Sequence, residues 1–192
     1  PNSFRVSWLS EALAKANDSR SLEGGIYVGH LNERKGVRYL FEALARLGGR
    51  LPFEVVGFGG LEEWCRGYVR DQGLSESVVF HGRQDRPLEL IAGADLLIVP
   101  SLFDSFPNTV LEALYAGTPV IGSDAPGIVS MLKEPELLFP RGDAEALARR
   151  LEELVDAPEE YRRVREACVE RRAAFDFDWG ESWLELFRRL VA

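Results

Sequence analysis

The chain has 192 residues, of which 46% are hydrophobic and 28% charged, and its formal net charge is −8 at pH 7. This size and composition suit a single well-packed domain. The acidic balance argues against a nucleic-acid binder, because such proteins usually gather Lys and Arg on one face. No apolar run approaches the roughly 20 residues that span a bilayer, and no secretory signal pattern opens the sequence. We therefore expect a soluble, cytoplasmic protein without a transmembrane segment, and leave open that a longer form associates peripherally with a membrane.

Short apolar runs alternate with amphipathic stretches along the chain. In chain order, the expected strands lie at 24–29, 53–57, 78–80, 96–99, 119–122 and 136–139. The expected helices lie at 35–47, 61–71, 87–92, 107–115, 143–155 and 158–174. Because the strands are almost continuously hydrophobic, they suit a parallel sheet that is covered on both faces. The sequence predicts an α/β fold, a Rossmann-like doubly wound parallel sheet of about six strands with helices on both faces, whose ligands lie beyond the carboxyl ends of the strands.

The clearest chemical pattern lies where the strand at 96–99 turns into the helix at 107–115. Pro107 suits a first helical turn, and Asp104 or Ser105 can cap the helix. Free amides at the start of a helix point outward together with its positive dipole and favour a phosphate. Here the expected amides are those of Asn108, Thr109 and Val110.

Two carboxylates flank this expected phosphate site. Glu112 stands roughly 7 Å along the helix axis, at about 1.5 Å per residue, so its carboxylate can accept both hydroxyls of a ribose. Asp104 lies on the turn before the helix and faces the other way, toward hydroxyls of a sugar. The two acids are therefore spaced to bracket a nucleotide diphosphate sugar.

Asp104 and Glu112, separated by seven residues and followed by the run E-A-L-Y-A-G-T-P-V at 112–120, form a pattern that resembles the E-x7-E signature of retaining GT-B glycosyltransferases. These enzymes belong to glycosyltransferase family 4, the glycosyl transferases group 1. In that family the first acid is implied to contact the donor sugar and the second the ribose. Asp104 stands where the family has Glu.

The segment 28–37 resembles the family's G-R-L-x-x-x-K-G element, in which a basic pair is implied to hold the donor diphosphate. Lys35 matches this element, and His30 stands where Arg is usual. The segment 56–60 resembles the turn after the second strand, and 80–83 resembles the turn beside the base. The implied catalytic residues are Lys35, Asp104 and Glu112. The implied substrate-binding residues are Gly29, His30, Arg34, Gly57, Gly59, Gly82, Arg83, Ser105, Phe106, Asn108, Thr109 and Val110.

The resemblance also implies a domain organisation. Residues 1–20 would be an interdomain linker and entry segment, 21–175 the nucleotide-sugar-binding domain, and 176–192 a helix that crosses back to an N-terminal acceptor-binding domain. We expect that domain to lie outside this sequence. The implied activity is transfer of a hexose from a UDP- or GDP-linked donor to an acceptor, with retention and without a metal or cofactor. The isolated domain is expected to be a poor catalyst.

Two alternatives to a transferase stay open. One is a nucleotide-sugar-binding module that has lost catalysis, and the replacements at His30 and Asp104 favour it. The other is a GT-B-like nucleotide-sugar epimerase. A dinucleotide-dependent oxidoreductase is disfavoured, because the first strand is followed by G-H-L-N-E and not by the G-x-G-x-x-G fingerprint. The sequence also lacks the G-K-[ST] phosphate loop of nucleoside triphosphatases.

We expect no metal site and no disulfide. Asp176 and Asp178 spell D-x-D, a metal-binding pattern in another glycosyltransferase fold, but they follow the predicted sheet. Cys65 and Cys168 lack the spacing of a metal clamp or a redox pair, so both are expected to be reduced helix residues.

Overall fold

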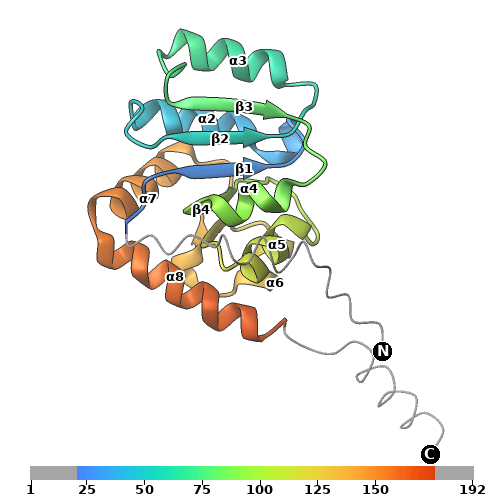
Figure 1. The fold of residues 1–192 in the computed structure, drawn as a ribbon, viewed down its shortest axis with the longest axis vertical. Helices are drawn as coiled ribbons and strands as arrows, with labels where there is room; N and C mark the ends of the chain where they lie inside the picture. The colour runs from blue at the N-terminus through green and yellow to red at the C-terminus, as the bar shows by residue number, and fades with distance from the viewer. Residues whose placement is uncertain (1–20, 176–192) are drawn as a thin grey trace, which may run out of the picture.

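A wholly parallel sheet organises residues 21–175, the part of the chain that the computed structural model describes (Figure 1). Its strands are β1 Gly25–Val28, β2 Phe53–Val56, β3 Val78–Gly82, β4 Leu96–Val99, β5 Val120–Ser123 and β6 Leu138–Phe139. Their order across the sheet is β3-β2-β1-β4-β5-β6. The predicted doubly wound α/β fold is confirmed.

Helices cover both faces of this sheet (Figure 1). α2 packs against α3 and α7, and α4 packs against α5, which also contacts α8. The helices are α2 Val37–Arg46, α3 Glu62–Asp71, α4 Pro87–Gly93, α5 Asn108–Ala116, α6 Pro126–Leu132, α7 Ala144–Asp156 and α8 Pro158–Ala173, with short 3-10 turns η1 Glu33–Lys35 and η2 Pro135–Leu137. Among residues 21–175, no helix has the length and apolar character needed to cross a bilayer.

The core lies on both sides of the central strands. Ile26 on β1, Leu97 and Ile98 on β4, and Ile121 on β5 are fully buried. Burying one such side chain stabilises a fold by about 1.5–3 kcal/mol, which explains why these nearly continuous apolar runs occupy the middle of the sheet. The strand order reverses between β1 and β4, which pair at Gly25↔Leu96, and the crevice at such a reversal is where open α/β sheets bind ligands.

Three predicted elements need correction. The helix expected at 35–47 begins at Val37, because Gly36 adopts the left-handed conformation with φ of 68° and ends the turn η1. The sixth strand is shortened to Leu138–Phe139, because η2 occupies the residues before it. α6 was not predicted as a helix, although Pro126 at its first turn is a favourable start.

Two of the expected segments cannot be compared with the structure. The linker at 1–20 and the tail helix at 176–192, with its D-x-D acids, lie beyond the described residues.

Cys65 and Cys168 are free and buried, and burial raises the pKa of both thiols to about 12, which makes them unreactive near neutral pH.

Candidate functional site

The loops that follow β1 and β4 meet at the carboxyl edge of the sheet. The main-chain N–H of Leu102 donates to the carbonyl of Arg34 at 2.9 Å, and the N–H of Phe103 donates to the same carbonyl at 3.3 Å. Gly36 lies directly against the carbonyl of Pro100. Two segments far apart in the sequence are therefore joined through their main chains, and the side chains they carry are brought together.

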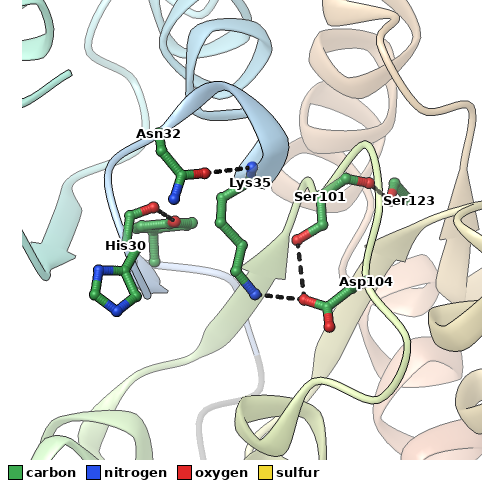
Figure 2. A network of polar contacts seen from close by, with 7 residues as sticks. His30, Asn32, Lys35, Ser101, Asp104 and Ser123 are labelled. Atoms are coloured by element: carbon green, nitrogen blue, oxygen red, sulfur yellow. Dashed lines mark hydrogen bonds and ion pairs between the residues drawn. The ribbon is translucent and has the colours of Figure 1, made fainter. Parts of the chain in front are cut away.

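Lys35 and Asp104 form an ion pair at this junction (Figure 2). The Nζ of Lys35 donates to Oδ2 of Asp104, and the two side chains are 21% and 12% exposed. The hydroxyl of Ser101 donates to the same carboxylate oxygen at 3.4 Å. The hydroxyl of Ser123 in turn donates to the main-chain carbonyl of Ser101. Both serines are buried, so a small polar network on the protein side supports the carboxylate.

The turn η1 fixes the main chain of Lys35. The side chain of Asn32 accepts a hydrogen bond from the Lys35 N–H at 3.0 Å and so caps the turn. Sequence reasoning placed Lys35 at the start of a helix, but the residue belongs to this separate turn. Arg34, beside it, is exposed and contributes its main-chain carbonyl to the loop junction.

The first turn of α5 presents free amides, although not all of those expected. Within the described part of the chain, the N–H groups of Asn108 and Thr109 have no acceptor, whereas that of Val110 donates to the Pro107 carbonyl at 3.1 Å. Pro107 is the cap residue and not the first helical residue, with φ of −70° and ψ of 116°. The amides that can receive an anion are those of the first two helical residues.

The expected side-chain cap of α5 is absent. Neither Asp104 nor Ser105 makes a capping hydrogen bond to the helix. Asp104 is engaged by Lys35, and its main-chain carbonyl accepts the N–H of Gly127 at 3.2 Å. Ser105 and Phe106 are exposed beside the helix start.

Glu112 lies on the second turn of α5 and is half-buried. Burial raises the pKa of its carboxyl above the ordinary value. No residue between 21 and 175 forms a hydrogen bond or ion pair with its side chain. A half-buried carboxylate without a partner is costly, and such groups are common where a ligand supplies the missing donors.

The loops after β1, β2 and β3 are also joined through their main chains. The N–H of Leu31 donates to the carbonyl of Phe58 at 2.9 Å, and the N–H of Gly57 donates to the carbonyl of Gly82 at 2.8 Å. Gly57 is pressed against the loop after β1, where an added β-carbon would stand 1.8 Å from the carbonyl oxygen of Gly29. Gly59 has a similarly close approach to the same loop.

These loops border an open pocket of about 280 Å³ whose lining includes Gly29, His30, Gly57, Phe58 and Arg83. Phe58 is 41% exposed, the ring of His30 meets it edge-on at 4.9 Å, and the guanidinium of Arg83 lies 5.5 Å from its centroid. The hydroxyl of Tyr27 donates to the main-chain carbonyl of His30 at 2.8 Å. An exposed aromatic ring beside a cation suits a planar ring of a ligand.

The predicted site residues thus fall into two groups along one edge of the sheet. The first surrounds the Lys35–Asp104 pair and the start of α5, and the second surrounds Phe58. Sequence reasoning missed four residues that complete these groups, namely Tyr27, Phe58, Ser101 and Ser123. A small polar residue shortly after an apolar strand, such as Ser101 two residues beyond β4, is the signal that could have been used.

His81, in the segment 80–83, has a structural partner. His81 lies with Nε2 at 2.9 Å from Oε2 of Glu54, a contact between the neighbouring strands β2 and β3. Residues 21–175 contain no cluster of three or more His, Cys, Asp or Glu side chains that could hold a metal ion.

Comparison with known proteins shows that the chain is similar to part of several proteins that are named as sugar-transferring enzymes. A family model described as glycosyl transferases group 1 matches residues 23–171. The chain is similar to a lipopolysaccharide 1,6-galactosyltransferase of Salmonella typhimurium, with 36% identity over 105 residues that cover 52% of this chain and 29% of that protein. It is also similar to a 2-deoxystreptamine N-acetyl-D-glucosaminyltransferase of Streptomyces fradiae, with 33% identity over 176 residues that cover 86% of this chain and 42% of that protein.

A solved structure shares the architecture. Sucrose-phosphate synthase from Thermosynechococcus elongatus matches with a TM-score of 0.73 and 28% identity, over 95% of this chain and 49% of that chain. The chain therefore spans less than half the length of each of these three proteins. Because the family match extends over residues 23–171, which include both groups of site residues, the chain belongs to the glycosyl transferases group 1 family.

Proposed function

We propose that this chain is the donor-binding domain, C-terminal in a longer GT-B enzyme, of a retaining glycosyltransferase of family 4. The observation that carries the proposal is a set of three groups at the edge where the sheet order reverses: the Lys35 ammonium, helix amides that have no acceptor among residues 21–175, and the Glu112 carboxylate, which has no partner among the same residues. A nucleotide diphosphate sugar has groups complementary to all three. The proposed donor is UDP- or GDP-linked, and the proposed enzyme is cytoplasmic.

The diphosphate is assigned to the space between Lys35 and the start of α5. The amides of Asn108 and Thr109 point out of the helix with its positive dipole, and Lys35 supplies a full positive charge. The chain as a whole is acidic, with a net charge of −8, so a bound anion must be balanced locally.

The ribose is assigned to Glu112. Its carboxylate stands on the second turn of α5, beyond the free amides, and has no hydrogen-bond donor among the described residues. Two vicinal hydroxyls can supply the donors that this half-buried group lacks. The base is assigned to the pocket beside Phe58 and Arg83, where an aromatic face is open.

Catalysis in this proposal rests on stabilising the leaving group. When the bond between the anomeric carbon and the diphosphate breaks, negative charge grows on the departing phosphate. The amides of Asn108 and Thr109 are fixed by the helix and aimed at that charge before the reaction begins, which is the preorganisation that lowers a barrier. Lys35 adds its positive charge once the bound phosphate has drawn it from Asp104. We propose retention at the anomeric carbon and no participation of a metal, with the acceptor held by an N-terminal domain.

Calorimetric titration with uridine, guanosine and adenosine diphosphates tests the proposal. We expect the 192-residue chain to bind one of them saturably, and Glu112→Ala to weaken that binding about tenfold, as expected for loss of hydrogen bonds to a charged group. Glu42, another half-buried acid within a helix, is the matched control, and Glu42→Ala should leave the affinity unchanged. Absence of binding to all three nucleotides would contradict the proposal.

A donor-binding module without catalysis is the second candidate. It is favoured by the histidine at position 30, which is exposed where a permanent cation is expected, and by the engagement of Lys35 with Asp104. Transfer measured in the full-length protein separates the two candidates. Activity that appears only after His30→Arg would favour the module, and activity in the unaltered protein would favour the enzyme.

A further inference from the structure

We propose that the Lys35–Asp104 ion pair makes the site discriminate between an intact nucleotide sugar and a free nucleoside diphosphate. This inference rests on the proposed function and assigns Asp104 a specificity-determining role. The carboxylate neutralises Lys35, the lysine that is proposed to bind the diphosphate (Figure 2). A phosphate therefore has to draw the ammonium group away from a partner that it already holds.

The carboxylate cannot easily follow the ammonium. The main-chain carbonyl of Asp104 accepts the N–H of Gly127, and a β-carbon on Gly127 would stand 2.2 Å from that carbonyl oxygen. Ser101, which is 1% exposed, donates its hydroxyl to the carboxylate at 3.4 Å. Lys35, in contrast, carries its charge on a long flexible stem and has no other ion-pair partner in the part of the chain described.

Loss of the ammonium leaves Asp104 with the Ser101 hydroxyl as its remaining side-chain donor among the described residues. A free nucleoside diphosphate has no group to offer this carboxylate, and the charge of its terminal phosphate repels it. An intact donor carries one negative charge less at that phosphate and places sugar hydroxyls beyond it. These hydroxyls can donate to the carboxylate and replace the lost ammonium contact.

The consequence is a site that favours the donor over the product of transfer. The energetic cost of opening the ion pair is present for both ligands, but the sugar compensates it in only one of them. The nucleoside diphosphate formed by transfer no longer has sugar hydroxyls to donate to Asp104. Its terminal phosphate also carries an additional negative charge, which faces the carboxylate. Product release is therefore assisted by the same carboxylate that receives the sugar.

Asp104→Asn tests this role because it removes the charge and keeps the shape. Titration of the 192-residue chain with uridine or guanosine diphosphate, whichever the unaltered chain binds, should show about tenfold tighter binding in Asp104→Asn, the order expected for removing a nearby like charge. UDP-glucose or GDP-mannose should gain less, so that the preference for the sugar nucleotide falls. Glu76→Gln makes the same charge change at an exposed residue before β3, at the opposite edge of the sheet, and should leave both affinities unchanged.

A ligand-free measurement examines the ion pair itself. Trace acetylation followed by mass spectrometry should label Lys35 more slowly in the unaltered chain than in Asp104→Asn, because the carboxylate shields the amine. Equal labelling rates would overturn the inference, as would an unchanged or weaker affinity of Asp104→Asn for the free nucleoside diphosphate. If the unaltered chain binds neither a nucleoside diphosphate nor UDP-glucose or GDP-mannose while labelling shows a shielded Lys35, the proposed function fails and the ion pair is a structural contact.

Discussion

Gly36 and Pro100 are in direct main-chain contact, and a β-carbon added to Gly36 would stand 1.9 Å from the Pro100 carbonyl oxygen. Gly36 also has a left-handed main chain, with φ of 68°. The contact closes the gap between the turn that carries Lys35 and the loop that carries Asp104. The position of the ion pair therefore depends on a residue that has no side chain.

We predict that Gly36→Ala destabilises the chain by about 3 kcal/mol, because a left-handed alanine costs about 1–2 kcal/mol and the clash adds to it. Gly117 is the matched control, since its φ is 76° and an added β-carbon meets nothing within 4 Å. Gly117→Ala should lower the free energy of unfolding only by the conformational cost of a left-handed alanine. Urea denaturation measures the free energy of unfolding of both variants. Equal losses would mean that the loops at Gly36 and Pro100 move apart without an energetic cost.

We predict that Glu112→Gln stabilises the empty chain near neutral pH. Burial raises the pKa of Glu112 in the folded state, so folding favours its protonated form and the ionised form is penalised. The penalty is present above the raised pKa and disappears below the unfolded value of about 4.5. Since the group is partly exposed, we expect Tm of Glu112→Gln to exceed that of the unaltered chain by about 1 °C at pH 7.

The pH dependence provides the check on this prediction. The difference in Tm should shrink as the pH falls through the acid range and vanish below the unfolded pKa. A lower Tm for Glu112→Gln at pH 7 would mean that the carboxylate has a stabilising partner in the folded chain.

We predict that Phe58→Ala weakens binding of the nucleoside diphosphate about tenfold, because stacking on an aromatic ring contributes about 1–3 kcal/mol per base. Inorganic pyrophosphate, which has no base, should bind equally to both forms. Phe58→Tyr keeps the aromatic face and serves as the control. Equal loss of affinity for pyrophosphate would show that Phe58 acts through the loop and not through the base.

We predict that Tyr27→Phe destabilises the chain by about 1 kcal/mol through loss of the hydrogen bond to the His30 carbonyl. Tyr27 is 2% exposed, and burial raises its pKa above the usual value, so its hydroxyl stays protonated and the loss should be constant between pH 6 and 9. Tyr39, half-buried on α2, makes no such bond within residues 21–175, and Tyr39→Phe is the control. Guanidinium denaturation at several pH values measures the difference.

The strands and most helices could be predicted because their signals are local. The run Leu96–Val99 is wholly apolar and wholly buried, and the predicted strand there needed no correction. The break at Gly36 was not predictable from the apolar spacing, because that spacing starts at Val37 and carries no information about the turn before it. A glycine that ends one turn and precedes another element is visible only from its φ.

The candidate site was predictable in part for the same reason. Glu112 and the free amides of Asn108 and Thr109 follow from one strand-to-helix junction, so sequence spacing places them together. The Lys35–Asp104 pair joins residues 69 positions apart, and its existence depends on which strands are neighbours. Sheet order, which the sequence alone did not supply, decides that β1 and β4 lie side by side.

The loops at the carboxyl edge are joined to one another by main-chain hydrogen bonds, from the Gly57 N–H to Gly82 and from the Leu102 N–H to Arg34. These bonds do not involve side chains, so the frame of the site is independent of most residues that it displays. Exposed positions such as His30, Ser105 and Phe106 are therefore suited to saturation libraries that alter donor preference. The glycines at the loop contacts are the positions that such a library has to leave untouched.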